Sequence, residues 1–407
     1  MAVVGLLALV AAGCGDRATP WRGDAGLLFL GDSAGLRAVR ADSGETAFSA
    51  AGGVASFDWS HLYSARQTSD GTTLARLDPT SGAVLSESHL ERGLTVRAVS
   101  HNGGIVALGP PRAAGPVYHP MPRSQTVLVV VANGGQPRRY VAQGNLEPEA
   151  FSVDGTSLFV LDFTPPTAPV RYQVRQLDLD TGTVVDVNSP DKDLQRAMGA
   201  TARTQALSPD GMRLYTLYTL LDERTSRERP AFVHVLDLGG KWAHCVHLPR
   251  PFGNTPDGPA AIAVSRDGTR LFAYDGTYGI VAEVDTVNLS VLRTSSVKVP
   301  ASSLAAAASI LPGGHLVVAG GRRVVTLDPA SLRRVRSWSL RQPVVAVQAA
   351  ADRRGLYVAF KDSVALLDAD RGSELRRIAA AGVEGIGFVG SLPRPGASVR
   401  GGVTCAC

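Results

Sequence analysis

Lysine, cysteine and long apolar runs are scarce in this chain of 407 residues. Only four of its 41 basic residues are lysines, so the net charge of +5 comes from arginine. The arginines lie in short, dispersed clusters without interleaved aromatic residues, whereas a nucleic-acid groove needs a continuous basic stripe. We therefore expect no nucleic-acid partner.

Motifs for catalysis and for cofactor binding are also scarce. The sequence has no Gly-x-x-x-x-Gly-Lys loop, and its one Gly-x-Ser-x-Gly match, Gly31 to Gly35, falls inside the first predicted hairpin and not between a strand and a helix, where a nucleophile elbow lies. His244, Cys245 and His247 lie close together, but strand alternation would place Cys245 and His247 on one face and His244 on the other. Two ligands do not make a closed zinc site. The sequence thus predicts no catalytic residue, no metal site and no cofactor.

One unbroken apolar run, from Ala2 to Ala12, opens the chain. As a helix it would span roughly 16 Å against about 30 Å of hydrocarbon, which is the length of a signal-peptide core and too short for a membrane span. The small residues Ala11, Ala12 and Gly13 then precede Cys14. This stretch predicts a signal peptide over 1–13.

The sequence "LVAAGC" around Cys14 resembles the lipobox of bacterial lipoproteins. That resemblance implies cleavage before Cys14, diacylglyceryl attachment to its thiol, and a polar tether over 14–25. The chain would then be lipid-anchored on the extracytoplasmic face of the cell membrane. An incidental or buried cysteine after an ordinary signal peptide is the alternative. Outside the cytoplasm, Cys245 could form a disulfide with Cys405 or Cys407.

A repeat of about 40 to 57 residues runs through the rest of the chain. Its first half joins two strands through an Asp-Gly turn, as in "AFSVDGTSLFVLDF" (150–163) and "AVSRDGTRLFAYDG" (263–276). Its second half is a hairpin such as "RQLDLDTGTVV" (175–185), and eight such hairpins recur. Asp-Gly supplies the positive φ of tight turns, and four strands in each unit are typical of propeller blades. Tandem hairpin sandwiches are the alternative architecture.

The two ends of the repeat region predict how the ring closes. The first hairpin (27–48) has no innermost strand, and the last strand (383–391) has no successor. Pairing them completes one blade and removes two open sheet edges. We therefore expect an all-β propeller over 26–391 with eight four-stranded blades, or seven if one degenerate early unit fails to form, and a tail over 392–407.

The "LYV…VxxLDxxxG" pattern resembles the YVTN-type propeller repeats of bacterial surface and periplasmic proteins. The resemblance covers roughly residues 26 to 391 and implies the fold, since propellers host enzymes, binding proteins and scaffolds alike.

Long insertions break the repeat in its third to fifth units. They lie at 109–123, 163–172 and 220–231 within blades, and at 188–200 and 249–260 between blades. The short Asp-containing turns all fall on one face of a propeller, here called the turn face. The insertions all fall on the opposite face, here called the loop face. Loops also tolerate insertions without any function, which is the alternative explanation.

Arginine dominates the polar residues of these insertions, which favours an anionic or carboxylate-bearing partner. The predicted contact residues are Arg112, Tyr118, His119, Arg123, Arg171, Tyr172, Lys192, Arg196, Asp222, Glu223, Arg227 and Arg229.

The sequence therefore predicts an extracytoplasmic, membrane-anchored propeller that binds an unknown protein or anionic ligand of the cell envelope. An extracytoplasmic propeller enzyme of the hydrolase or lactonase type is the alternative. Bound metal, or acids and histidines that converge on the central channel, would distinguish the two.

Overall fold

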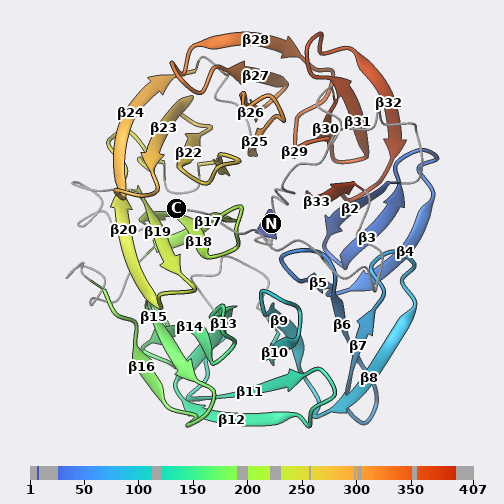
Figure 1. Ribbon diagram of the computed structural model, residues 1–407, viewed down its shortest axis with the longest axis vertical. Helices are drawn as coiled ribbons and strands as arrows, with labels where there is room; N and C mark the ends of the chain where they lie inside the picture. The colour runs from blue at the N-terminus through green and yellow to red at the C-terminus, as the bar shows by residue number, and fades with distance from the viewer. Residues whose placement is uncertain are drawn as a thin grey trace, which may run out of the picture.

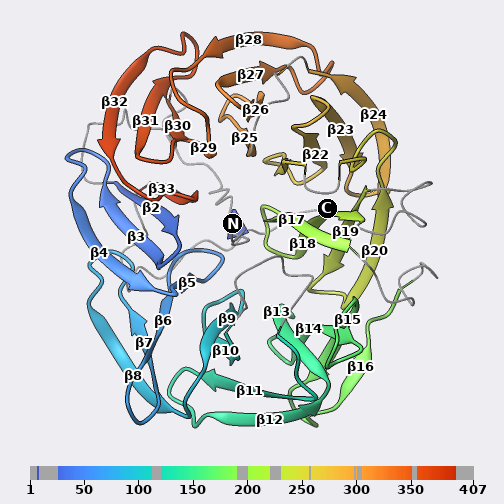
Figure 2. The same cartoon turned by 180° about the vertical axis from the view of Figure 1, so that it is seen from behind.

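The computed structural model describes residues 7–8, 26–111, 121–189, 200–220, 231–255, 258–297, 299, 305–350 and 355–390. Within these ranges the chain forms eight sheets and no helix. The sheets stand in a ring around a central axis, and each runs outward from an inner strand near that axis (Figure 1). The view from behind shows the same closed ring (Figure 2). The predicted eight-bladed propeller is confirmed.

Blade 1 joins the two ends of the described chain, as the sequence predicts. The inner strand β33 (Gly385–Gly390) pairs antiparallel with β2 (Leu27–Asp32), followed outward by β3 (Gly35–Arg40) and β4 (Thr46–Ala51). Leu27 lies opposite Gly390, and Gly31 lies opposite Gly385. The ring is therefore closed by backbone hydrogen bonds between strands more than 350 residues apart.

The other seven blades each use four consecutive strands. Blade 2 comprises β5 (Val54–Ala55), β6 (Leu62–Gln67), β7 (Thr72–Leu77) and β8 (Val84–Leu90). Blade 3 comprises β9 (Thr95–Val99), β10 (Ile105–Gly109), β11 (Gln125–Ala132) and β12 (Arg138–Gln143). Blade 4 comprises β13 (Asn145–Phe151), β14 (Ser157–Thr164), β15 (Arg171–Asp178) and β16 (Val184–Asp186).

Blade 5 comprises β17 (Ala200–Leu207), β18 (Arg213–Leu220), β19 (Ala231–Asp237) and β20 (Trp242–His247). A fifth strand, β1 (Leu7–Ala8), pairs in parallel with the inner strand β17. Blade 6 comprises β21 (Ala260–Val264), β22 (Arg270–Asp275), β23 (Ile280–Asp285) and β24 (Ser290–Ser296).

Blade 7 comprises β25 (Ala306–Ile310), β26 (Leu316–Gly320), β27 (Arg323–Leu327) and β28 (Arg334–Ser339). Blade 8 comprises β29 (Ala346–Ala349), β30 (Gly355–Ala359), β31 (Ser363–Asp368) and β32 (Glu374–Ala379).

The turn from the first to the second strand repeats one hydrogen-bond pattern in blades 2 to 6. In blade 4, Ser152 Oγ donates to Asp154 Oδ1 (2.6 Å) and accepts from the Ser157 amide (3.0 Å). The Gly155 amide donates to the Ser152 carbonyl, with a φ of 69° at the glycine. The equivalent serines are Ser56, Ser100, Ser208 and Ser265. In blades 4 to 6 the Ser-x-Asp-Gly sequence thus closes this turn with side-chain and backbone bonds together, whereas blade 2 has Trp59 in place of the glycine and blade 3 has Asn102 in place of the aspartate.

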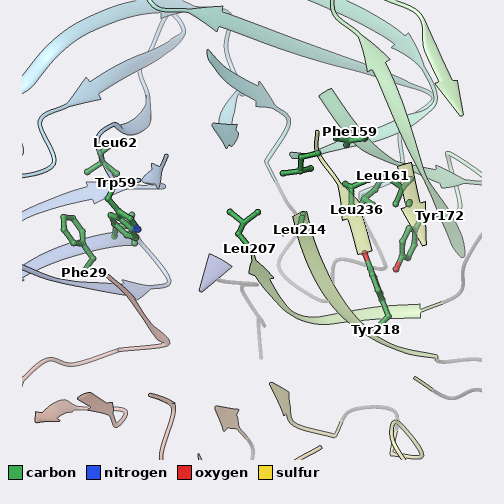
Figure 3. Close-up of a cluster of buried hydrophobic side chains, with 14 of the residues drawn as sticks. Phe29, Trp59, Leu62, Phe159, Leu161, Tyr172, Leu207, Leu214, Tyr218 and Leu236 are labelled. Atoms are coloured by element: carbon green, nitrogen blue, oxygen red, sulfur yellow. The ribbon is translucent and has the colours of Figure 1, made fainter. Parts of the chain in front are cut away.

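The hydrophobic core lies between neighbouring blades. Leu217 of blade 5 and Ile262 of blade 6 share one buried cluster, and Leu28 of blade 1 and Tyr357 of blade 8 share another. Figure 3 shows two parts of a further cluster, one around Phe29 and Trp59 and one in blades 4 and 5. Because each sheet is covered by its neighbours on both sides, its middle strands read as nearly continuous apolar runs.

Candidate functional site

The structure describes three of the predicted contact residues, Arg123, Arg171 and Tyr172. The others lie outside the described residues, and they are Arg112, Tyr118, His119, Lys192, Arg196, Asp222, Glu223, Arg227 and Arg229. Cys14, Cys405 and Cys407 lie outside them as well.

Tyr172 does not lie on the loop-face surface. Strand β15 begins at Arg171, one residue before Tyr172, which pairs in register with Phe163 of β14. The Tyr172 side chain is only 1% exposed, and its ring lies 5.8 Å from the ring of Tyr218 in blade 5 (Figure 3). Burial raises the pKa of its hydroxyl well above the ordinary value. The prediction of a surface contact is therefore wrong for Tyr172, because strand alternation turns its ring into the core.

Arg171 is exposed at the start of β15, on the loop face. It pairs in register with Thr164, at the end of β14. The connection between the two strands is therefore shorter than the sequence suggests. Strand β14 reaches Thr164, so the insertion proper covers residues 165–170.

Strand β20 carries Cys245, whose side chain is buried in the core of blades 4 and 5. Ala243 and Cys245 pack into the same buried cluster as Phe232, whose ring lies 6.0 Å from the ring of His247. Cys245 and His247 therefore share a face of an outer strand. No group of three or more potential metal ligands occurs among the described residues.

Arg123 takes part in a buried cluster of ionic groups at the loop face between blades 3 and 4. Arg97 of β9 donates from Nη2 to Glu147 Oε2 of β13 at 2.6 Å, and both side chains are less than 5% exposed. Arg123 Nη2 lies 3.6 Å from the other carboxylate oxygen, Glu147 Oε1. One buried carboxylate is thus shared by two guanidinium groups, which offsets part of the desolvation cost of each.

The two loops around this cluster are bonded to each other. Asn145 Nδ2 donates to the carbonyls of Met121 and Pro166, both at 3.0 Å, and the Arg123 amide donates to the Pro166 carbonyl at 3.1 Å. Met121 and Arg123 belong to the loop of blade 3, and Pro166 to the loop of blade 4. These bonds fix the backbone from which the Arg123 side chain projects.

The Arg123 guanidinium has hydrogen-bonding capacity to spare. Its side chain is 12% exposed as a whole, while its Nη1 is buried and has no hydrogen-bond partner among the described residues. Burial lowers the pKa of Arg123, and the Glu147 carboxylate opposes that effect. A guanidinium stays charged in proteins, so this nitrogen is a charged donor that suits a carboxylate or phosphate oxygen.

Polar groups continue along the inner strands of blades 4 and 5. Gln205 Nε2 of β17 donates to Glu149 Oε1 of β13 at 2.9 Å and to Thr216 Oγ1 at 3.1 Å. The inner strands β21, β25 and β29 of blades 6 to 8 instead carry no charged residue. The charged part of the inner ring therefore lies in the same sector as the loop-face insertions.

Sequence reasoning identified Arg123 but missed Arg97, Glu147 and Glu149. Arg97 lies in the strand-like segment "TVRAV", and Glu147 and Glu149 both lie in "NLEPEAF", about 50 residues further on. Only an alignment of the inner strands of all units would have revealed these three residues. That alignment shows charged residues in blades 3 to 5 where other blades have alanine, valine or glycine.

The fold and this site define the class of the molecule: an eight-bladed β-propeller with charged inner strands beneath one sector of its loop face. Among the described residues there is no helix with the length and hydropathy of a membrane span.

Solved structures similar to this chain include two of AztD from Citrobacter koseri. Its crystal structure has a TM-score of 0.55 and 12% identity, over 90% of this chain and 98% of that chain. Its apo structure has a TM-score of 0.53 and 13% identity, over 91% and 98%. Dihydro-heme d1 dehydrogenase NirN in complex with DHE gives a TM-score of 0.46 and 15% identity, over 94% and 79%. No protein-family model and no curated protein sequence matches the chain. At these identities the likeness shows the fold alone.

Proposed function

We propose that this chain is an extracytoplasmic lipoprotein, anchored through Cys14, whose propeller binds an anionic partner of the cell envelope at the loop face of blades 3 to 5. The observation that carries the binding proposal is the guanidinium of Arg123, which is held beside the buried Arg97–Glu147 pair and has no partner at Nη1 among the described residues. The arginines predicted in the neighbouring insertions would extend this site outward.

The chemistry of the cluster supports an anionic partner. Glu147 already neutralises part of the charge of Arg97 and Arg123, so the pair can be buried without a ligand. A carboxylate or phosphate oxygen at Nη1 would form a charge-assisted hydrogen bond in a partly desolvated setting, where such bonds are stronger than in water.

Titration of the purified mature protein with inorganic phosphate and with poly-L-glutamate tests the binding site. We expect saturable binding that weakens as salt is added, because exposed charges are screened. Arg123→Gln should weaken it about tenfold, which is the effect of losing one charged hydrogen bond. Arg139→Gln removes the same charge from the outer strand of blade 3, where Arg139 pairs with Glu91, and should leave binding unchanged. Equal binding by both variants, or none by the native protein, would overturn the proposal.

Cell fractionation tests the anchor separately. Two or more acyl chains on Cys14 would hold the protein firmly in a bilayer, since each buried methylene contributes about 0.8 kcal/mol. Cys14→Ser should therefore move the protein from the membrane fraction into the soluble fraction. A serine variant that stays with the membrane would rule out anchoring through this thiol.

A further inference from the structure

A cavity of about 410 Å³ lies between blades 4 and 5, away from the cluster around Arg123. This volume falls within the range of about 300–1,000 Å³ that is usual for small-molecule sites. Strands β15, β16, β19 and β20 contribute to its walls. The described lining residues are Gln173, Val174, Asp186, Val187, Ser189, His234 and Ala243.

His234 is the buried polar group of this cavity. Its side chain is 1% exposed, and its Nε2 has no hydrogen-bond partner among the described residues. The ring of Tyr218 meets it edge-on at 6.2 Å, which holds the imidazole in place without satisfying its nitrogens. A buried ring nitrogen without a partner costs free energy unless something in the cavity bonds to it.

Charge at the mouth of the cavity disfavours an anion. Asp186 is the charged side chain among the described lining residues, and it is largely exposed. It pairs with Arg175 at 3.1 Å and accepts from Gln173 Nε2 at 3.4 Å. Arg175 also lies 3.4 Å from Asp162, so one guanidinium serves two carboxylates. An anionic ligand would have to pass this surplus of negative groups.

The interior of the cavity disfavours a cation as well. Burial, with a smaller contribution from His244, lowers the pKa of His234 to about 4. The imidazole is therefore neutral at neutral pH, because its surroundings do not support a positive charge. A neutral imidazole presents one N–H donor and one acceptor nitrogen, and Gln173 adds an amide with the same two capacities.

We propose that the cavity between blades 4 and 5 binds an uncharged, hydroxyl-rich small molecule such as a saccharide, with His234 as its buried hydrogen-bonding partner and Gln173 as the partner nearer the surface. Hydroxyl groups both donate and accept, so they match the two side chains. Val174, Val187 and Ala243 supply apolar wall for the C–H face of such a ligand. This site is independent of the anionic site proposed at the loop face.

Histidine ¹⁵N spectra and calorimetric titration of the full mature protein test this proposal. The probes are glucose and maltose, with inorganic phosphate as the anionic control and propylamine as the cationic control. We expect one of the two saccharides to bind saturably and to shift the ring nitrogens of His234, while neither control probe does. No shift with either saccharide, or a shift with phosphate or propylamine instead, would overturn the proposal.

Three variants locate the binding. Gln173→Leu replaces the amide with an apolar side chain of comparable bulk, so saccharide affinity should fall about tenfold. His234→Gln should weaken binding to a similar extent. His244→Gln alters the adjacent strand outside the described lining and should bind as the native protein does. If His234→Gln fails to fold, Gln173→Leu still tests the proposal, because a native saccharide affinity in that variant would contradict the proposed site.

Discussion

Trp59 occupies a backbone position that glycine fills in four of the five related turns. Its φ is 58°, where Gly103, Gly155, Gly211 and Gly268 have values of 68° to 72°. A non-glycine residue in this region costs of order 1 kcal/mol or more. The side chain offsets that cost, because the indole is 2% exposed and its ring lies 4.7 Å from that of Phe29 in blade 1.

These two effects predict the outcome of Trp59→Gly. Relief of the backbone would stabilise the fold by about 1 kcal/mol, but removal of a buried tryptophan costs about 3–5 kcal/mol or more. We expect a net loss of at least about 2 kcal/mol in the free energy of unfolding, measured by urea denaturation. Leu289→Gly is the control for the backbone effect. Leu289 has a comparable φ of 51°, but its side chain is only partly buried, so its removal takes away less packing. A stabilised Trp59→Gly protein would contradict this account.

His234 predicts a pH dependence of stability within a definite window. Its pKa of about 4 in the folded chain lies below the ordinary 6.5, so the unfolded state takes up the proton first as the pH falls. The contribution of the neutral ring to the free energy of unfolding is complete above pH 6.5 and is lost as the pH falls from 6.5 to 4. That loss amounts to about 3 kcal/mol.

Urea unfolding at a series of pH values measures this effect. His234→Gln should flatten the curve between pH 6.5 and pH 4, while His89→Gln, at an exposed histidine of blade 2, should keep its native slope. The same slope in both variants would show that another group is responsible.

At the scale of the element, the first-to-second-strand turn shows how much its side chains contribute. Ser152→Ala removes the hydroxyl that accepts from the Ser157 amide, and both residues are buried. The amide then lacks a partner, which costs about 1–3 kcal/mol. We expect the lower part of this range, because blade 7 forms the turn from Leu311 to His315 through backbone bonds, without a serine.

A thermal melt of Ser152→Ala measures this cost, with Ser43→Ala in an exposed turn of blade 1 as the control. Ser152→Ala should have a melting temperature several degrees below that of Ser43→Ala. Equal melting temperatures would mean that the backbone bonds alone determine the turn.

The same turns explain why the fold was predictable and the site was not. Tight turns, several of them Asp-Gly, and alternating strands are local signals that recur along the chain, so the count of blades and the closure of the ring could be derived from the sequence. Tyr172 was misplaced because the end of β14 and the start of β15 depend on pairing across blade 4. The contact of Arg97 with Glu147 joins two blades, and no local pattern encodes it.

At the scale of the whole molecule, β33 is the strand on which closure depends. It pairs along the edge of β2, where Leu28, Phe29 and Leu30 are fully buried, and its Ile386 packs in one cluster with Leu28 and Leu30. Exposing such side chains costs about 1.5–3 kcal/mol each, and the sum is comparable with a typical net stability of about 5–15 kcal/mol. A chain that ends at Glu384 should therefore lose its cooperative unfolding transition.

Circular dichroism melts of two truncations check this expectation. A chain that ends at Gly390 retains β33 and should unfold cooperatively, whereas the chain that ends at Glu384 should not. A sharp transition in both would mean that the ring does not need the terminal strand.

Closure by strands from both ends also determines the order of events during synthesis. Strands β2 to β4 of blade 1 are made before those of blades 2 to 8, yet their inner partner, β33, is the last described strand to be made. Until then the edge of β2 presents unpaired backbone groups that could pair with another chain. A contact across so much sequence also forms slowly. The nascent propeller therefore needs the edge of β2 kept apart from other chains until β33 has been made.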